Sequence, residues 1–212
     1  MSKRSNGFDR RERDFYPTPR TAVLPLIPHL RATRIRTFCE PCAGDGALVR
    51  HLETFGLVCA HASDIATGTD ARDIQNFDSP VITNPPYERK LMHALIWHFV
   101  AKAPCAWLLL EYDWTATKQA RPFLPHCSDI VMVGRLRLIE GSPFTGLDNI
   151  AWLRFSADHR AGPILHAGDS TPPRTRICPC GDAFRPARSD ARFCSFACKQ
   201  RAYRARVAVT EP

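Results

Sequence analysis

Residues 36–46 read RTFCEPCAGDG, and this stretch contains the features that decide the fold. A short apolar segment ends in an acid, Glu40, and the glycines Gly44 and Gly46 then interrupt the chain. The next segment, residues 47–55, has apolar side chains at helical spacing. A short buried strand, a glycine loop and a helix in this order predict the first part of a β-α-β unit.

The same alternation continues along the chain. Short apolar segments at residues 57–63, 80–83 and 106–110 are expected to form buried strands. Residues 88–102 have the pattern of an amphipathic helix. Strands that alternate with helices are typical of a mostly parallel sheet covered on both faces, so the predicted fold class is α/β.

Two further segments complete the predicted domain. Residues 135–139 and 150–155 are expected to be strands separated by a loop. We interpret them as an antiparallel hairpin that closes one edge of the sheet. Near the N-terminus, residues 18–30 have helical spacing, but Pro25 must kink this helix or end it early.

Three of the predicted strands end in residues suited to ligand binding. Glu40 precedes the glycine loop, Asp64 follows the second strand, and Asn84 follows the third. Ligands of open parallel sheets bind beyond the carboxyl ends of the strands, so these residues should line one crevice. Glycines let the backbone approach a ligand closely, and an acid at a strand tip suits the hydroxyls of a ribose. The pattern predicts a site for a nucleoside-bearing cofactor.

The tetrapeptide Asn84-Pro85-Pro86-Tyr87 adds reactive chemistry to this crevice, and we interpret all four residues as catalytic. Two consecutive prolines remove two backbone donors, so the loop presents mainly carbonyl oxygens. The side-chain oxygen of Asn84 and the carbonyl of Pro85 could accept both hydrogens of an exocyclic amine. This would direct the amine lone pair out of the base plane. Tyr87 could stack on a base that is flipped out of a nucleic-acid duplex.

The motifs at residues 40–46 and 84–87 resemble the cofactor and catalytic signatures of adenine-N6 DNA methyltransferases of the class I fold. The segment Tyr16-Pro17-Thr18-Pro19 resembles the one that packs over the methionine end of the cofactor in that family. The motif order is similar to that of small phage-borne or prophage-borne members, and the resemblance covers residues 15–155. It implies a Rossmann-like sheet, S-adenosylmethionine as cofactor and methyl transfer to the N6 amine of adenine in DNA.

The resemblance also implies which residues bind the cofactor. Asp64 would hold the ribose, and Ile65 would pack against the cofactor adenine. Asp73, or Asp70 three residues before it, would bind the amine of that adenine. The implied set is Tyr16, Pro17, Thr18, Pro19, Glu40, Pro41, Ala43, Gly44, Asp45, Gly46, Asp64, Ile65, Asp73 and Asn84.

The implied reaction is direct transfer, in which the amine of a flipped-out adenine attacks the sulfonium methyl group while Asn84 and Pro85 hold it. One departure from the family is that no large target-recognition insertion is present. Sequence specificity is therefore expected to be low, or to come from short loops at residues 118–125 and 141–149.

Nine cysteines are many for a chain of 212 residues, and four of them crowd near its end. Cys178, Cys180, Cys194 and Cys198 form two close pairs, the arrangement that tetrahedral Zn²⁺ needs. A module this short cannot build a core, so metal binding would supply its folding energy. The segment resembles small treble-clef-like zinc fingers. The other cysteines, at positions 39, 42, 59, 105 and 127, are expected to be small buried hydrophobic residues.

The net charge of +8 is concentrated at the two ends of the chain. Residues 171–212 hold nine basic and three acidic residues, and residues 1–20 hold six and three. Basic ends on a near-neutral body favour binding to a polyanion, although such ends can also be solvated tails. After the last cysteine, a predicted helix carries residues that suit phosphate contacts and base stacking, namely Lys199, Arg201, Tyr203, Arg204 and Arg206.

The predicted organisation has four segments. They are a basic arm at 1–14, a methyltransferase domain at 15–155, a linker at 156–176, and a zinc finger with a basic helix at 177–206. No apolar stretch is long enough to cross a membrane and the N-terminus is charged, so we expect a cytoplasmic protein with no membrane partner. A monomer is expected. DNA is the expected partner, with RNA as a possibility.

Two alternatives remain open at this stage. The acceptor could be RNA adenine or a protein glutamine side chain, because each presents an NH₂ group next to an sp² carbon. The chain could also be a zinc-dependent DNA-binding protein in which the methyltransferase fold is inactive.

Overall fold

A computed structural model describes residues 17–136, 146, 148–168, 176–178, 180, 183–184 and 192–207 of the chain. The chain divides into two compact units, Met1–Ser170 and Thr171–Pro212. Each unit is described by itself. None of the helices in the described ranges is long and apolar enough to cross a membrane.

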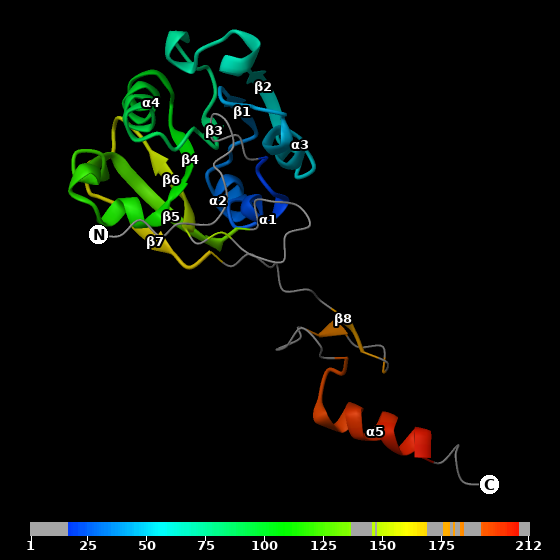
Figure 1. Ribbon diagram of the computed structural model, residues 1–212. Coiled ribbons are helices and arrows are strands. Elements are labelled where there is room, and N and C mark those ends of the chain that lie inside the picture. Colours follow the sequence, from blue (N-terminus) through cyan, green and yellow to red (C-terminus); the bar gives the residue numbers. More distant parts are fainter. Residues whose placement is uncertain are drawn as a thin grey trace. The chain divides into compact units, whose positions relative to one another are not determined.

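The first unit is built around a mixed sheet with the strand order β2-β1-β3-β4-β6-β5-β7 (Figure 1). The strands are β1 Thr37–Glu40, β2 Val58–Ala62, β3 Val81–Thr83, β4 Ala106–Glu111, β5 Cys127–Arg135, β6 Asn149–Phe155 and β7 Ile164–His166. Strands β2, β1, β3 and β4 are parallel to one another, whereas β6 is antiparallel to both β4 and β5. The predicted fold class, a Rossmann-like α/β sheet with an antiparallel edge region, is confirmed.

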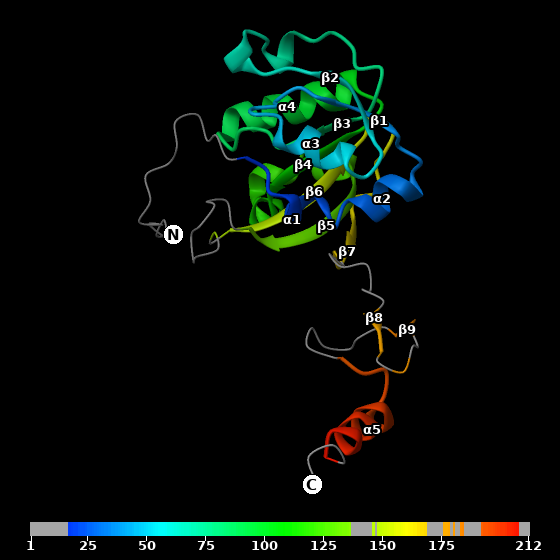
Figure 2. The same cartoon turned by 90° about the vertical axis from the view of Figure 1, so that its right-hand side faces the viewer.

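Helices cover both faces of this sheet (Figure 2). The α-helices of the first unit are α1 Arg20–Val23, α2 Ile27–Ala32, α3 Ala47–Glu53 and α4 Arg89–Lys102. Short 3-10 helices are η2 Ile65–Thr67, η3 Ala71–Asp73, η4 Tyr112–Ala116, η5 Lys118–Ala120 and η6 Leu124–His126. The helix expected over residues 18–30 is interrupted at Pro25, as its missing N–H requires.

The side chains of strand β4 are divided between two hydrophobic clusters, one on each face of the sheet. Its side chains point alternately to opposite faces, as in any strand. Leu108 and Leu110 pack in the cluster that includes α4, whereas Trp107 and Leu109 pack in the cluster that includes α1, α2 and α3. All four side chains are buried. This two-sided burial explains why the segment reads as a continuous apolar run.

The predicted edge hairpin requires a correction. The strand expected at 135–139 is instead β5, Cys127–Arg135, and residues 137–139 lie outside the described ranges. The ladder between β5 and β6 also shifts register twice, near Cys127 and near Met132. Polar residues and irregular pairing hide the strand from a search for apolar periodicity.

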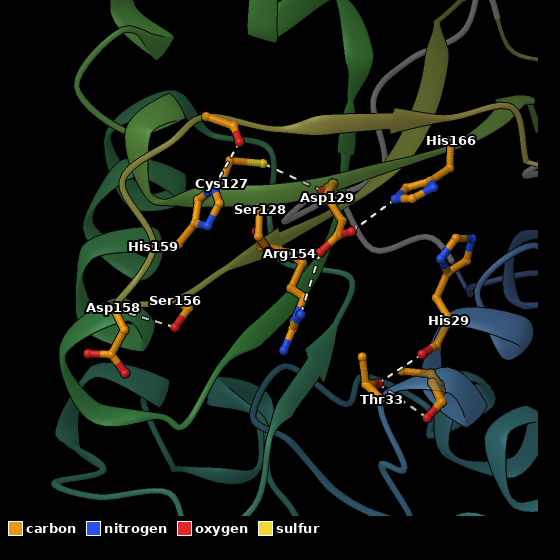
Figure 3. A network of polar contacts seen from close by, with 12 residues as sticks. His29, Thr33, Cys127, Ser128, Asp129, Arg154, Ser156, Asp158, His159 and His166 are labelled. Carbon is orange, nitrogen blue, oxygen red and sulfur yellow. Dashed lines mark hydrogen bonds and ion pairs between the residues drawn. The ribbon is translucent and has the colours of Figure 1, made fainter.

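Strand β7 was not expected, because residues 156–176 were predicted to be a linker. It pairs in parallel with β5, and Asp129 on β5 supports the contact (Figure 3). His166 Nε2 lies 2.9 Å from one carboxylate oxygen, and the Arg154 guanidinium lies 3.5 Å from the other. Burial raises the pKa of Asp129, but hydrogen bonds from His166 and Ser128 and the charge of Arg154 bring it below its usual value. The sheet edge is therefore held by a charged cluster.

The second unit contains few regular elements. Strands β8 Arg176–Ile177 and β9 Ala183–Phe184 pair antiparallel, and α5 runs over Phe196–Val207. Of its described residues, the hydrophobic side chain that is buried is that of Cys178. This unit has no apolar core comparable to that of the first unit within the described ranges.

Candidate functional site

A cavity of about 600 Å³ opens at the carboxyl ends of the parallel strands in the first unit. It lies beside the loops that follow β1, β2 and β3, which is the position expected for a ligand in an open α/β sheet. The lining residues are Pro17, Thr18, Glu40, Pro41, Cys42, Ala43, Gly44, Asp45, Leu48, Asp64, Ile65, Ala66, Asp70, Ala71, Asn84, Pro86, Leu91 and Leu95. Residues from all three strand ends singled out in the sequence therefore share one cavity.

Glu40 lies at the end of β1 and is the most deeply buried acid of the cavity, with 1% of its surface exposed. Thr83 Oγ1 donates a hydrogen bond to its Oε1 at 2.5 Å, and the Cys42 amide donates another at 3.3 Å. Its Oε2 is buried and has no partner among the described residues. Burial raises the pKa of Glu40 to about 8, and the hydrogen bonds offset this only in part. A hydrogen-bond donor or a cation bound in the cavity would therefore stabilise the ionised form of this carboxyl group.

The glycine loop and the tip of β2 are joined by the Asp64 carboxylate. The Gly44 amide donates to Oδ2 at 2.8 Å, and the Ala66 amide donates to Oδ1 at 2.8 Å. Each carboxylate oxygen can accept a further hydrogen bond, so Asp64 can bind a ligand hydroxyl while it stays fixed. Gly46 has a φ of 76°, a conformation that favours glycine, and leads directly into α3.

Asp73 and Asp70 are the two acids expected as alternatives to bind the amine of the cofactor adenine. Asp70 lines the cavity, whereas Asp73 is not among its lining residues. Asp70 is held by Arg72, whose guanidinium donates to Oδ2 at 2.5 Å. Hydrogen bonds from Arg72 lower the pKa of Asp70 to about 2, against the effect of its partial burial. The geometry favours Asp70 over Asp73 as the acid that can meet a ligand.

The loop after β3 brings Asn84 to the same cavity. Its side-chain Nδ2 donates to Thr18 Oγ1 at 3.1 Å, and its Oδ1 accepts a hydrogen bond from the Tyr87 hydroxyl at 2.9 Å. Pro86 lines the cavity, whereas Pro85 is buried and does not. The amide of Asn84 therefore lies on the cavity wall with its orientation held from two sides.

Several predicted residues lie elsewhere. Pro19, Gly46, Asp73, Pro85 and Tyr87 are not lining residues, and Tyr16 lies outside the described ranges. Conversely, the apolar part of the wall was not among the predicted site residues. It is formed by Leu48, Ala66, Ala71, Leu91 and Leu95, together with Cys42. The spacing of Leu91 and Leu95, four residues apart on α4, is the available signal for a shared helix face.

The second unit contains a separate candidate site, a cysteine cluster made of Cys178, Cys180, Cys194 and Cys198. Their sulfur atoms all lie within 4.8 Å of one another. Sγ of Cys194 lies 3.6 Å from that of Cys180 and 3.4 Å from that of Cys198. A Zn–S distance of about 2.3 Å in a tetrahedron places the sulfurs about 3.8 Å apart, close to these values. The four thiols thus fit a tetrahedral metal site.

Helix α5 begins within this cluster and carries the predicted nucleic-acid contacts. Lys199, Arg201 and Tyr203 are exposed. Arg204 and Arg206 belong to the helix, but their side chains lie outside the described part of the chain. Phe196, which was not among the predicted contacts, is 73% exposed, and Tyr203 seven residues later is 70% exposed. A separation of seven residues places both rings on one face of the helix.

The solved structures named here are distantly similar to the chain. Neither a protein-family model nor a curated protein matches the chain. Similar solved structures include a candidate RNA methyltransferase of Pyrococcus horikoshii, with 16% identity, a TM-score of 0.46, and 68% of this chain and 87% of that one covered.

Two others are the 23S rRNA methyltransferase ErmE and a dimethyladenosine transferase from Plasmodium falciparum. The first has 13% identity and a TM-score of 0.43, with 72% of this chain and 73% of that one covered. The second has 13% identity and a TM-score of 0.41, with 66% and 62% covered. Likenesses this distant carry no conclusion about activity or substrate.

Proposed function

We propose that this protein transfers a methyl group from S-adenosylmethionine to the N6 amine of adenine in DNA. The observation that carries the proposal is that Glu40, Asp64 and Asn84 line one cavity. A buried carboxyl group, a second carboxylate suited to ribose hydroxyls and a side-chain amide therefore lie on the walls of one cavity. Its volume of about 600 Å³ is within the range of small-molecule sites.

The residues present fit the proposed cofactor. Glu40 lines the cavity with its Oε2 lacking a hydrogen-bond partner, and the cationic α-ammonium group of a methionine moiety would favour the ionised carboxylate and give it a donor. Asp64 retains acceptor capacity for ribose hydroxyls. Ile65 lines the cavity yet is 59% exposed, so it offers an apolar surface to a nucleobase. When bound, S-adenosylmethionine supplies an electrophilic methyl group on a sulfonium centre.

Asn84 is the residue proposed to act on the acceptor. Its Oδ1 can accept a hydrogen bond from the adenine amine and orient the nitrogen toward the methyl carbon. The amine nitrogen forms the new N–C bond as the C–S bond breaks, the electron pair remains on sulfur, and the amine then releases a proton to solvent. Because Pro85 does not line the cavity, the Asn84 oxygen is the acceptor that the geometry supports best.

The second unit is proposed to be a zinc finger that contacts nucleic acid. The cysteine cluster would bind Zn²⁺ and fix the start of α5. Helix α5 contains Lys199, Arg201, Arg204 and Arg206 and no acidic residue, which suits phosphate binding. The exposed rings of Phe196 and Tyr203 could stack on bases.

The decisive experiment is incubation with methyl-labelled S-adenosylmethionine and separate DNA, RNA and protein pools, followed by nucleoside analysis. We expect N6-methyladenine in DNA. Asn84→Ala should lower the rate by about 10² or more, the scale seen when a preorganised polar contact is lost. Asn76→Ala is the matched control, because Asn76 is exposed and does not line the cavity.

Each other result changes the assignment in a defined way. Label only in RNA adenine would replace DNA by RNA as the acceptor. Label on cytosine, or only on protein, would contradict the adenine assignment. Absence of both transfer and cofactor binding would favour a nucleic-acid-binding protein with an inactive fold.

A further inference from the structure

We infer that Thr18 is a positioning residue that holds the Asn84 amide in the orientation needed for methyl transfer. The inference rests on the function proposed above and goes beyond it. Thr18 and Asn84 are 66 residues apart in the sequence and meet through the Asn84 Nδ2 to Thr18 Oγ1 hydrogen bond of 3.1 Å. The resemblance to known methyltransferases assigned Thr18 only to the cofactor.

The position of Thr18 is well defined by its surroundings. Its side chain is buried, with 5% of the residue exposed. Pro17 and Pro19 flank it and restrict the backbone on both sides. The following helix α1 is tied to the sheet, because the Trp152 indole donates a hydrogen bond to the Ala22 carbonyl at 2.7 Å. Thr18 is thus a fixed partner for a loop that has to be placed accurately.

The hydrogen-bonding capacity of the Asn84 amide shows what this contact does. A primary amide has two N–H donors and a carbonyl oxygen with two lone pairs. Thr18 accepts one N–H, and the Tyr87 hydroxyl donates to one lone pair. The second lone pair of Oδ1 is then available for the adenine amine. If the amide were turned over, its NH₂ group would oppose the amine, and the contact from Asn84 Nδ2 to Thr18 Oγ1 belongs to the orientation in which Oδ1 can accept from the amine.

Thr18 also lines the cavity, so a direct cofactor contact is the competing explanation. The two roles differ in what they change. A cofactor contact contributes to binding, and its loss raises the dissociation constant of S-adenosylmethionine. A positioning contact contributes to the transferring geometry, and its loss lowers the rate even when both ligands are saturating.

The test compares Thr18→Val, which removes the hydroxyl but keeps the shape, with Thr18→Ser, which keeps the hydroxyl. Single-turnover methyl transfer is measured with saturating cofactor and adenine-containing DNA, and the cofactor dissociation constant is measured by calorimetry. We expect Thr18→Val to lower the transfer rate about tenfold, the scale of one hydrogen bond, with less than a threefold change in the dissociation constant. Thr18→Ser should restore the rate.

A rate unchanged in Thr18→Val, or a loss confined to cofactor affinity, would overturn the inference. Melting temperatures of the variants show whether folding is affected, and Thr18→Ala serves as a second variant should Val not fit. The Asn84 side-chain amide resonance in ¹⁵N NMR reports the contact independently of activity. If the chemical shift of this resonance differs between wild type and Thr18→Val while the wild type methylates no substrate, the contact exists. In that case the proposed function is wrong and the positioning role fails with it.

Discussion

The two units of this chain are stabilised in different ways. In the first unit, side chains from five strands and four α-helices are buried on both faces of one sheet. In the described part of the second unit, Cys178 is the buried hydrophobic residue, while Phe196 and Tyr203 are largely exposed. The first unit can be stabilised by burial of apolar surface, whereas the described residues of the second offer little such surface to bury.

The comparison indicates what the cysteine cluster contributes. A segment without a core needs another source of folding free energy, and a structural metal is a common one. All four tryptophans of the chain, at positions 97, 107, 114 and 152, belong to the first unit. Tryptophan fluorescence therefore reports the first unit alone, and metal content reports the second. The two units can be tested separately in the intact protein.

The largest expected effect is in the second unit. Cys194→Ser should abolish binding of one Zn²⁺ per chain and unfold this unit, because three thiolates cannot complete the tetrahedral site. The tryptophan unfolding transition should stay unchanged. Zinc content is measured by elemental analysis, and trypsin should cleave the arginine-rich C-terminal segment rapidly. Cys59→Ser, on β2, is the control and should keep its zinc; a shifted tryptophan transition in Cys194→Ser would contradict independent stabilisation.

A smaller effect is expected from the converse change in the first unit. Leu109→Ala removes a fully buried side chain of β4 and should lower the free energy of unfolding by about 2–5 kcal/mol. Denaturant unfolding followed by tryptophan fluorescence measures this change, and zinc content should not fall. Leu165→Ala is the control, because Leu165 is 57% exposed and should cost less than about 0.5 kcal/mol. Loss of zinc in Leu109→Ala would show that the units depend on each other.

The smallest expected effect concerns an acid buried in the first unit. The pKa of Glu40 is raised from 4.5 to about 8, so the unfolded chain loses this proton at lower pH than the folded protein. Raising the pH from about 4.5 to about 8 should therefore destabilise the first unit, by up to a few kcal/mol, with no further change above that range.

Glu40→Gln should remove this dependence. The variant should gain stability relative to wild type as the pH rises, as measured by urea unfolding at pH 5, 7 and 9. Glu53→Gln, an exposed change on α3, is the control for the loss of one negative charge. A difference between Glu40→Gln and wild type that stays constant with pH would argue against a raised pKa.

The local sequence pattern was sufficient to predict most of the parallel strands and helices of the first unit. Strands β1, β3 and β4 and helices α3 and α4 were expected within a few residues of their observed bounds. Each is a segment whose burial follows a simple periodicity or a continuous apolar run. The turn chemistry at Gly44 and Asn84 also depends on neighbouring residues, so the loops that form the cavity could be recognised from the sequence.

Strands β5 and β7 show where local pattern was insufficient. β5 contains Ser128 and Asp129, which interrupt its apolar character, and β7 has only three residues. Both are strands because neighbouring strands supply backbone partners and because His166 and Arg154 contact Asp129. Such stabilisation depends on residues far along the chain and leaves no periodic signal.

The sequence by itself determined the α/β class, the loop motifs and the two cysteine pairs, because each depends on residue type and short spacing. The tertiary structure alone decided that Asp70 rather than Asp73 lines the cavity, that Glu40 is buried with one oxygen lacking a partner, and that Thr18 contacts Asn84. Burial and hydrogen bonding between distant segments depend on how the chain closes on itself, which no local pattern records.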